Sequence, residues 1–228
     1  MRVLILRPKE LMDETLKKFK NAGFDAYGCP FIELEYLNFN VPDHDVAIVM
    51  SQNSAREIVK RGIKLKRVIA IGKKTAEILK SNGYDVITPS RFDSATLVKE
   101  FMNELRGKKV VVVKSNARNN EIEKLSEVSD VLEVIAYRIK PLKGKKQREI
   151  AKNLDEFDVI VFSSSIIAKT FLELCDLNKL KNKTCIAIGP PTAKVLQSYG
   201  IKPLIPKEFT FDGVLELLKT IDSYRRKR

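Results

Sequence analysis

Six short turns hold most of the residues in this chain that could do chemistry. Each turn follows an apolar run and leads into a segment with a helical pattern. Free backbone N–H groups and the dipole at a helix start favour anions. Hydroxyl, amide and cationic side chains beside them therefore predict a site that binds carboxylates rather than a catalytic triad. The candidate residues are Arg7, Ser51, Asn53, Gly72, Thr75, Lys114, Ser115, Ser163, Ser164, Gly189 and Thr192.

Each of these residues also has a structural alternative. Serine and asparagine at such turns often cap the following helix. Thr75 and Thr192 could bond the carbonyl of the preceding turn, and Arg7 and Lys114 could pair with a nearby carboxylate. A ligand-binding role is favoured because ligands bind outside the carboxyl ends of parallel strands, where all these turns are expected to lie.

An internal repeat organises the chain. The stretches Ile71–Pro89 and Ile188–Pro206 match at a constant spacing of 117 residues. Each reads as a strand, a glycine turn, a threonine in the first helical turn, a helix and a second strand. Agreement over so many positions indicates an internal duplication.

Strand and helix patterns alternate along the whole chain. Continuous apolar runs such as Arg2–Leu6, Asp45–Met50 and Asp158–Phe162 are typical of strands covered on both faces. Ser54 and Glu57 have the spacing of a capping box, so we expect a helix to begin at Ser54. The alternation predicts an α/β fold of two similar lobes, each a parallel β-sheet flanked by helices. Neither a G-x-G-x-x-G nor a P-loop motif occurs, so no motif supports nucleotide binding.

Composition narrows the classes of function. A hydrophobic content of 44% in 228 residues supports a folded core, and no segment is as long as a membrane span. The single histidine and the three scattered cysteines lack metal-ligand spacing, so we expect no metal site and buried, free cysteines. The formal net charge of +13 fits a lysine-rich surface, a polyanionic small substrate or nucleic acid.

The motifs taken together resemble the uroporphyrinogen-III synthase family, HemD. The more specific part is AIGPPTA preceded by VFSSS. By resemblance, an enzyme of this family needs no cofactor. It takes linear hydroxymethylbilane, a polycarboxylate, removes its hydroxyl as water and closes the macrocycle with inversion of the last pyrrole ring, ring D. The matching stretches run from residue 2 to about residue 218 and are RVLILRP, SQNSA, IGKKTAEILKSNG, AYRIKP, VFSSS and AIGPPTAKVLQSYG.

The resemblance also implies how the lobes are built. It predicts a HemD-like, flavodoxin-like topology in which a two-stranded linker joins the lobes. Lobe 1 would be discontinuous, with residues 1–35 and 141–228, and lobe 2 would hold residues 38–137, with linkers near 36–37 and 138–140. Periodicity alone suggests a split near Gly107 instead.

Site roles follow from the same resemblance. Tyr137 matches the family tyrosine proposed to help the hydroxyl leave, as a general acid or hydrogen-bond donor. Arg7 matches the arginine at the end of the opening strand. An electron-rich pyrrole loses its hydroxyl easily, so we expect the protein mainly to hold the chain ends and direct closure. The turns that match those facing the family's cleft contain Ser51, Asn53, Thr75, Ser163, Ser164 and Thr192.

Several expectations complete this hypothesis. A lyase of this family serves tetrapyrrole biosynthesis, towards haem, sirohaem or cobalamin. Met1 leads directly into a strand without a signal peptide, so we expect a cytoplasmic protein, and we expect a monomer. A transient contact with hydroxymethylbilane synthase is expected, and no nucleic acid or membrane partner.

Other functions stay open at this point. The main alternative is a non-catalytic two-lobed protein that binds a polyanionic ligand. A nucleic-acid binder rests on net charge alone, since the chain has no tryptophan and 7% aromatic residues. Flavin binding rests on fold analogy alone.

Overall fold

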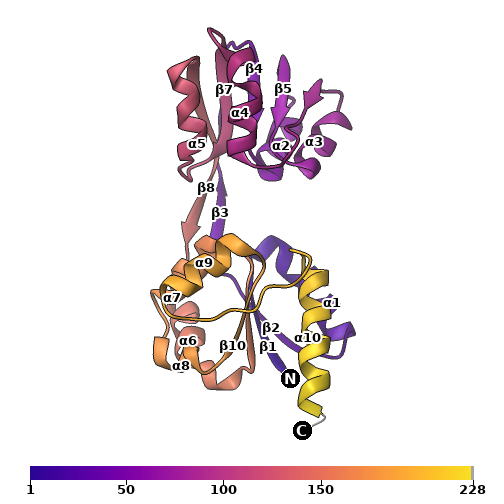
Figure 1. The fold of residues 1–228 in the computed structure, drawn as a ribbon, viewed down its shortest axis with the longest axis vertical. Helices are drawn as coiled ribbons and strands as arrows, with labels where there is room; N and C mark the ends of the chain where they lie inside the picture. The colour runs from indigo at the N-terminus through magenta and orange to yellow at the C-terminus, as the bar shows by residue number, and fades with distance from the viewer. Residues whose placement is uncertain (227–228) are drawn as a thin grey trace. The chain divides into compact units, whose positions relative to one another are not determined.

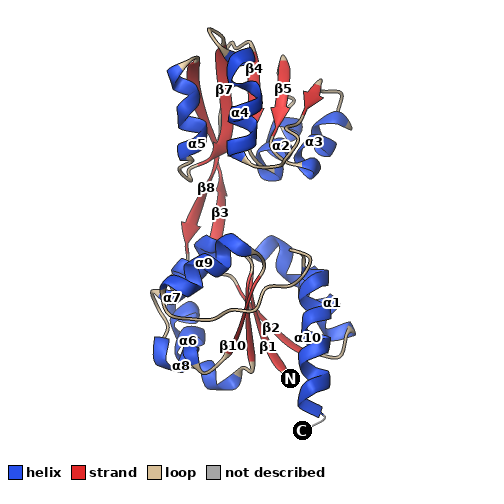
Figure 2. Ribbon diagram, in the orientation of Figure 1, coloured by secondary structure: helices blue, strands red, loops and turns tan. Residues whose placement is uncertain are grey.

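Two largely parallel sheets organise the protein. The computed structural model describes residues 1–226, with side chains up to residue 224. They group into two compact units: unit 1 comprises Met1–Glu33 and the chain from Lys140 onward, and unit 2 comprises Leu34–Ile139. Figures 1 and 2 show that helices cover both faces of each sheet, which confirms the predicted α/β class.

The sheet of unit 1 has four parallel strands in the order β10-β9-β1-β2. The strands are β1 (Arg2–Leu6), β2 (Asp25–Cys29), β9 (Val159–Phe162) and β10 (Thr184–Ala187). The helices are α1 (Met12–Asn21), α6 (Lys145–Lys152), α7 (Ser165–Leu172), α8 (Leu177–Lys181), α9 (Pro190–Ser198) and α10 (Phe211–Arg226). Two 3₁₀ turns, η1 (Lys9–Leu11) and η3 (Leu154–Glu156), complete the unit.

The central strands of unit 1 are buried on both faces because their apolar runs are covered by helices on each side. On one face, α1 and α10 pack onto β1 and β9 through residues such as Phe19 and Leu218, both fully buried. Phe162 of β9 contacts Phe171 of α7 edge to face, with ring centroids 5.4 Å apart.

The sheet of unit 2 has six strands in the order β3-β8-β7-β4-β5-β6, and the pairs from β8 to β6 are parallel. The strands β3 (Ile32–Tyr36) and β8 (Asp130–Pro141) each run across a boundary between the units. The other strands are β4 (Val46–Val49), β5 (Arg67–Ala70), β6 (Val86–Ile87) and β7 (Lys109–Ser115). The helices are α2 (Gln52–Lys60), α3 (Lys73–Lys80), α4 (Ser94–Leu105) and α5 (Asn120–Glu123), with the 3₁₀ turn η2 (Lys124–Glu127).

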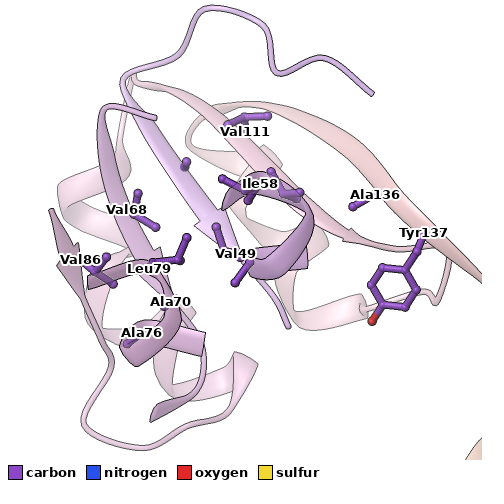
Figure 3. Close-up of a cluster of buried hydrophobic side chains, with 13 residues drawn as sticks. Val49, Ile58, Val68, Ala70, Ala76, Leu79, Val86, Val111, Ala136 and Tyr137 are labelled. Atoms are coloured by element: carbon purple, nitrogen blue, oxygen red, sulfur yellow. The ribbon is translucent and has the colours of Figure 1, made fainter. Parts of the chain in front are cut away.

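Each face of this second sheet has its own core. Val111 and Val113 of β7 pack with Ile58 of α2 and Leu79 of α3 on one face (Figure 3). Alternate residues of β7 point to the opposite face, where Val112 packs with residues of α4 and α5. The two faces of the sheet are thus distinct environments, which matters for the residues at its carboxyl edge.

The duplication is visible in the strand orders. The order β10-β9-β1-β2 in unit 1 corresponds to β5-β4-β7-β8 in unit 2, strand for strand. The short pairing of Ile186 with Leu204 repeats that of Ile69 with Ile87, again 117 residues away. Each unit therefore combines one half of the first sequence copy with one half of the second. A split near Gly107, which periodicity alone suggests, would cut through unit 2.

The start of α2 differs from the prediction. The helix begins at Gln52, and the Oγ of Ser51 accepts a hydrogen bond from the backbone N–H of Ser54 at 3.1 Å. The expected cap at Ser54 is therefore wrong, because the serine three residues earlier already satisfies that N–H group. None of the helices within residues 1–226 is long and apolar enough to cross a lipid bilayer.

Candidate functional site

In unit 1 the candidate residues share one edge of the sheet. Leu6, Phe162 and Ala187 are aligned across the three adjacent parallel strands β1, β9 and β10. The chain after each strand therefore emerges at the same carboxyl edge, the usual ligand-binding edge of such sheets. These turns carry Arg7, Ser163, Ser164, Gly189 and, one helical turn further on, Thr192.

Arg7 is held by two neighbours that are not carboxylates. Its Nη1 donates to the hydroxyl of Thr15, and its guanidinium carbon lies 4.3 Å from the centre of the Phe211 ring. Burial lowers the pKa of Arg7 from its usual value. No carboxylate lies within ion-pair distance among the described residues, so Arg7 keeps its charge available for an anionic ligand.

The two serines after β9 have different environments. Ser164 caps α7, since its Oγ accepts from the backbone N–H of Ile167 at 3.3 Å. Ser164 therefore has the helix-capping role that was the alternative to ligand binding. The side chain of Ser163 is half-buried and makes no hydrogen bond with the residues that the structure describes.

The start of α9 offers few backbone donors. Gly189 is its N-cap residue, and Pro190 and Pro191 follow at the first helical positions. Prolines have no N–H group, and the N–H of Thr192 donates to the carbonyl of Gly189 at 3.1 Å. This helix start therefore presents the end of the dipole but lacks the free amides that an anion usually meets there.

In unit 2 the candidate residues again share the carboxyl edge. Val49, Ala70 and Val113 are aligned across β4, β5 and β7. The turns that follow carry Ser51, Asn53, Gly72, Thr75, Lys114 and Ser115. Asn53 lies in the first turn of α2 with a half-buried side chain that has no hydrogen-bond partner in the described part of the chain. The Oγ of Ser115 accepts from the backbone N–H of Ala117 at 3.3 Å.

Tyr137 lies at the margin of the core beside α2. Tyr137 is 6% exposed and is labelled with the cluster in Figure 3. Its hydroxyl donates to the Oγ of Ser51 at 3.1 Å. The ring also lies beside that of Tyr36, with centroids 6.0 Å apart. Tyr137 and Ser51, two residues predicted for different roles, therefore form one hydroxyl pair.

A register shift brings Tyr137 to this face of the sheet. Lys114 is opposite Ile135, but Ser115 is opposite Tyr137, so β8 has one extra residue at this point. Alternation along β8 puts Val134 and Ala136 on the α2 face, and the next residue would normally point to the other face. The bulge cancels that reversal, and Tyr137 joins Ala136 on the α2 face.

Lys114 forms an ion pair with a carboxylate, the structural alternative to ligand binding. Its ammonium pairs with the Oε1 of Glu133 at 2.6 Å, and its side chain is 6% exposed. By alternation from Val112, Lys114 points to the α4 and α5 face of the sheet. The structure therefore does not bring Lys114 together with Ser51 and Tyr137.

The start of α3 differs from that of α9. Gly72 is the N-cap residue, so no side chain occupies the cap. Lys73 and Lys74, both exposed, follow at the first two positions. Their backbone N–H groups have no intrahelical acceptor, and their ammonium groups add positive charge. This start has the donors and charge that suit a carboxylate.

Thr75 and Thr192 are equivalent and equally buried, each 3% exposed. Neither hydroxyl makes a hydrogen bond within the described residues, so the expected alternative, a bond to the preceding carbonyl, is not found. By contrast, Thr170 donates to the carbonyl of Ile166 at 2.9 Å. A Cβ atom at Gly72 would lie 3.5 Å from the Oγ1 of Thr75, so this hydroxyl points back toward the cap. Neither oxygen is among the fully enclosed, unpartnered polar atoms, so solvent can reach both.

Sequence reasoning missed the residues that hold the candidates in place. Thr15 and Phe211 hold Arg7, and Tyr36 lies beside Tyr137. Thr15 had a detectable signal, since it is a polar residue on the apolar side of a helix. No group of three or more potential metal ligands occurs among the described residues.

Comparisons with known proteins agree with one another. A family model described as uroporphyrinogen-III synthase HemD matches residues 13–216. A protein of Archaeoglobus fulgidus, described as "Putative uroporphyrinogen-III synthase", is 56% identical over 225 residues, which cover 96% of this chain and 99% of that protein.

Two solved structures share the fold. One is a uroporphyrinogen-III synthetase from Helicobacter pylori, with a TM-score of 0.69 and 19% identity over 97% of this chain and 100% of the other. The second is a mutant uroporphyrinogen III synthase from Thermus thermophilus, with a TM-score of 0.68 and 17% identity over 100% of both chains. At these identities they support the fold alone.

Proposed function

The chain belongs to the uroporphyrinogen-III synthase family HemD, and from this membership we propose that it converts hydroxymethylbilane to uroporphyrinogen III. The resemblance inferred from the motifs is confirmed. In the proposed reaction the linear tetrapyrrole loses its terminal hydroxyl as water, and the macrocycle closes with inversion of ring D. The product would enter tetrapyrrole biosynthesis.

One observation carries the proposal beyond family membership. Two equivalent threonines, Thr75 and Thr192, each keep a buried but solvent-reachable hydroxyl without a hydrogen-bond partner in the described chain. Because solvent reaches both hydroxyls, water can bond them in the free protein, and an acceptor on a ligand can take the place of that water. A substrate with many carboxylate groups supplies acceptors, and the net charge of +13 attracts it.

Tyr137 and Ser51 supply the proposed proton chemistry. The carbon–oxygen bond of the hydroxymethyl group breaks, its electron pair leaves with oxygen, and a proton from Tyr137 completes the water molecule. The pyrrole nitrogen stabilises the carbon cation that remains. In the structure, the Tyr137 hydroxyl donates to Ser51. When the phenol turns its O–H to the substrate, the Ser51 hydroxyl can donate to the phenol oxygen and stabilise its developing charge.

In this proposal, most of the rate enhancement comes from positioning the two reacting ends of the substrate. The leaving step is easy for an electron-rich pyrrole, so the protein has mainly to hold the reacting ends close together. Within its own unit, Arg7 is suited to bind a carboxylate, and so is the start of α3 in the other unit. The monomeric state, the cytoplasmic location and the contact with hydroxymethylbilane synthase stay predictions.

A coupled assay tests the proposal. Hydroxymethylbilane is generated in place, with and without the protein, and the oxidised uroporphyrin isomers are separated by chromatography. The bilane closes spontaneously to isomer I, so a shift to isomer III in proportion to added protein is the expected result. Isomer I alone, from folded protein over a range of temperatures, would refute the proposed reaction and leave the non-catalytic anion binder.

A further inference from the structure

Two exposed phenylalanines occupy equivalent places in the repeat. Phe92 and Phe209 are 117 residues apart, the spacing of the duplicated motif. Each comes directly before the residue that caps the next helix. Asp93 accepts from the N–H of Thr96 at the start of α4, and Thr210 accepts from the N–H of Gly213 at the start of α10.

Both rings are exposed more than local packing requires. An apolar residue before an N-cap usually packs onto the fourth helical residue, which is Leu97 in α4 and Val214 in α10. Those two residues are fully buried, yet Phe92 is 55% and Phe209 is 58% exposed. Most of each ring is therefore left uncovered by the described residues.

Both phenylalanines belong to the carboxyl edge of their own sheet. The chain reaches Phe92 from β6, whose Ile87 pairs with Ile69 of β5 in parallel. It reaches Phe209 from Leu204, which pairs in parallel with Ile186 of β10. The loop after a parallel strand emerges at the carboxyl edge, where the candidate site residues of each unit lie.

Phe209 lies against the turn that starts α9. A Cβ atom added at Gly189 would be 3.4 Å from the Cγ of the Phe209 ring, so a larger residue would crowd the ring. The same helix start lacks N–H groups at Pro190 and Pro191. Prolines, a glycine backbone and a phenyl ring make this turn an apolar surface, unlike the start of α3 with Lys73 and Lys74.

We propose that Phe209 and its counterpart Phe92, each within its own unit, are substrate-binding residues whose ring packs against a pyrrole ring of a tetrapyrrole. This inference rests on the proposed function. Such a substrate alternates flat apolar rings with carboxylate side chains, so its site needs apolar faces beside anion-binding groups. Aromatic pairs of this kind add to binding through offset or edge-to-face contact. In unit 1, Arg7 supplies a cation for a carboxylate, and Phe209 supplies an apolar face for a pyrrole ring.

The test measures binding of uroporphyrinogen III, kept reduced, by calorimetry, together with KM in the coupled assay. We expect Phe209→Ala to weaken binding and raise KM by about tenfold, and Phe92→Ala to act in the same direction. Phe209→Leu and Phe92→Leu keep an apolar contact with the helix but lose the ring, and should recover only part of the loss. Melting temperatures establish that each variant is folded.

Tyr224→Ala is the matched control, because Tyr224 is 70% exposed near the other end of α10. It should leave binding and KM unchanged. Unchanged binding in the folded Phe209→Ala and Phe92→Ala variants would overturn the inference, even if wild-type protein forms isomer III. A wild-type dimer that these variants convert to monomer would also overturn it, by making the rings a subunit interface. Failure of the wild-type protein to form isomer III would instead refute the proposed function.

Discussion

The hydroxyl of Tyr137 donates to the Oγ of Ser51 at 3.1 Å, although the two residues are 86 positions apart in the sequence. The same Oγ accepts from the backbone N–H of Ser54 at 3.1 Å. One serine therefore caps α2 and orients the phenol. This pair links the local start of a helix to the residue proposed as proton donor.

Replacing Tyr137 with phenylalanine tests how much its hydroxyl proton contributes to kcat. We expect Tyr137→Phe to lower kcat by about tenfold, the worth of one neutral hydrogen bond, because positioning carries most of the effect. Tyr84→Phe is the control, since the Tyr84 hydroxyl donates to the carbonyl of Ile63 at 2.7 Å in the same unit. Activity of Tyr137→Phe below detection would make the tyrosine essential and the positioning account wrong.

A double-mutant cycle tests whether Tyr137 and Ser51 act as a pair. Ser51→Ala removes the cap of α2, so we expect it to lower the free energy of unfolding by about 1 kcal/mol. It should also lower kcat, and Tyr137→Phe in that background should cost less than in the wild type. Additive effects on kcat would show that the hydrogen bond does not contribute to catalysis.

Thr75 and Thr192 allow stability and binding to be separated. Thr75→Val and Thr192→Val keep the side-chain shape and remove hydroxyls that have no partner in the described chain. We expect the free energy of unfolding to stay within about 0.5 kcal/mol of wild type, or to rise, while KM increases. Urea unfolding and the coupled assay measure the two effects.

Thr170→Val is the matched control for these variants. Thr170 is also 3% exposed, but its hydroxyl donates to the carbonyl of Ile166. It should lose about 1 kcal/mol of stability and leave KM unchanged. A comparable loss of stability in Thr75→Val or Thr192→Val would mean that these hydroxyls have partners within the fold.

The ion pair of Lys114 and Glu133 predicts an asymmetry between its two partners. The Lys114 side chain is 6% exposed and that of Glu133 is 41% exposed. Glu133→Gln leaves a buried ammonium without its carboxylate, and we expect a loss of about 1–3 kcal/mol. Lys114→Met leaves only a half-exposed carboxylate and should cost less in urea unfolding. A raised KM in Lys114→Met would instead indicate that Lys114 reaches the substrate.

The three cysteines are free as expected, and Cys29 and Cys185 are buried, but Cys175 is half-buried, so the expectation of burial is wrong for that residue. Their thiols are expected to be unreactive in the folded protein. Burial raises the pKa of Cys29 and of Cys175 to about 11, and that of Cys185 to about 12. A raised pKa keeps the thiol protonated at neutral pH, and the thiolate is the reactive form. Thiol titration at pH 7.5 should therefore be slow for the native protein and rapid for all three cysteines in denaturant. Rapid labelling of the folded protein would contradict this burial.

Short-range sequence patterns were enough to predict most local elements and the edge at which the site residues lie. Apolar runs such as Arg2–Leu6 specify buried parallel strands, and residues just after them must emerge at the carboxyl edge. The repeat predicted that Thr75 and Thr192 would have equivalent places, which they have. These features depend on residues close together in the chain.

The pairing between the halves of the repeat could not be predicted from these patterns. β1 lies beside β9 rather than beside β4, so each unit takes strands from both copies. Strand pairing depends on packing between distant segments. Apolar runs of similar composition do not specify which strand each one pairs with.

The faces on which the site side chains lie also depend on packing between distant segments. The bulge beside Lys114 and Ser115 turns Tyr137 toward Ser51. Glu133 forms an ion pair with Lys114 on the opposite face. A shift of one residue reverses the face that a strand residue occupies, and only the packed sheet sets that register.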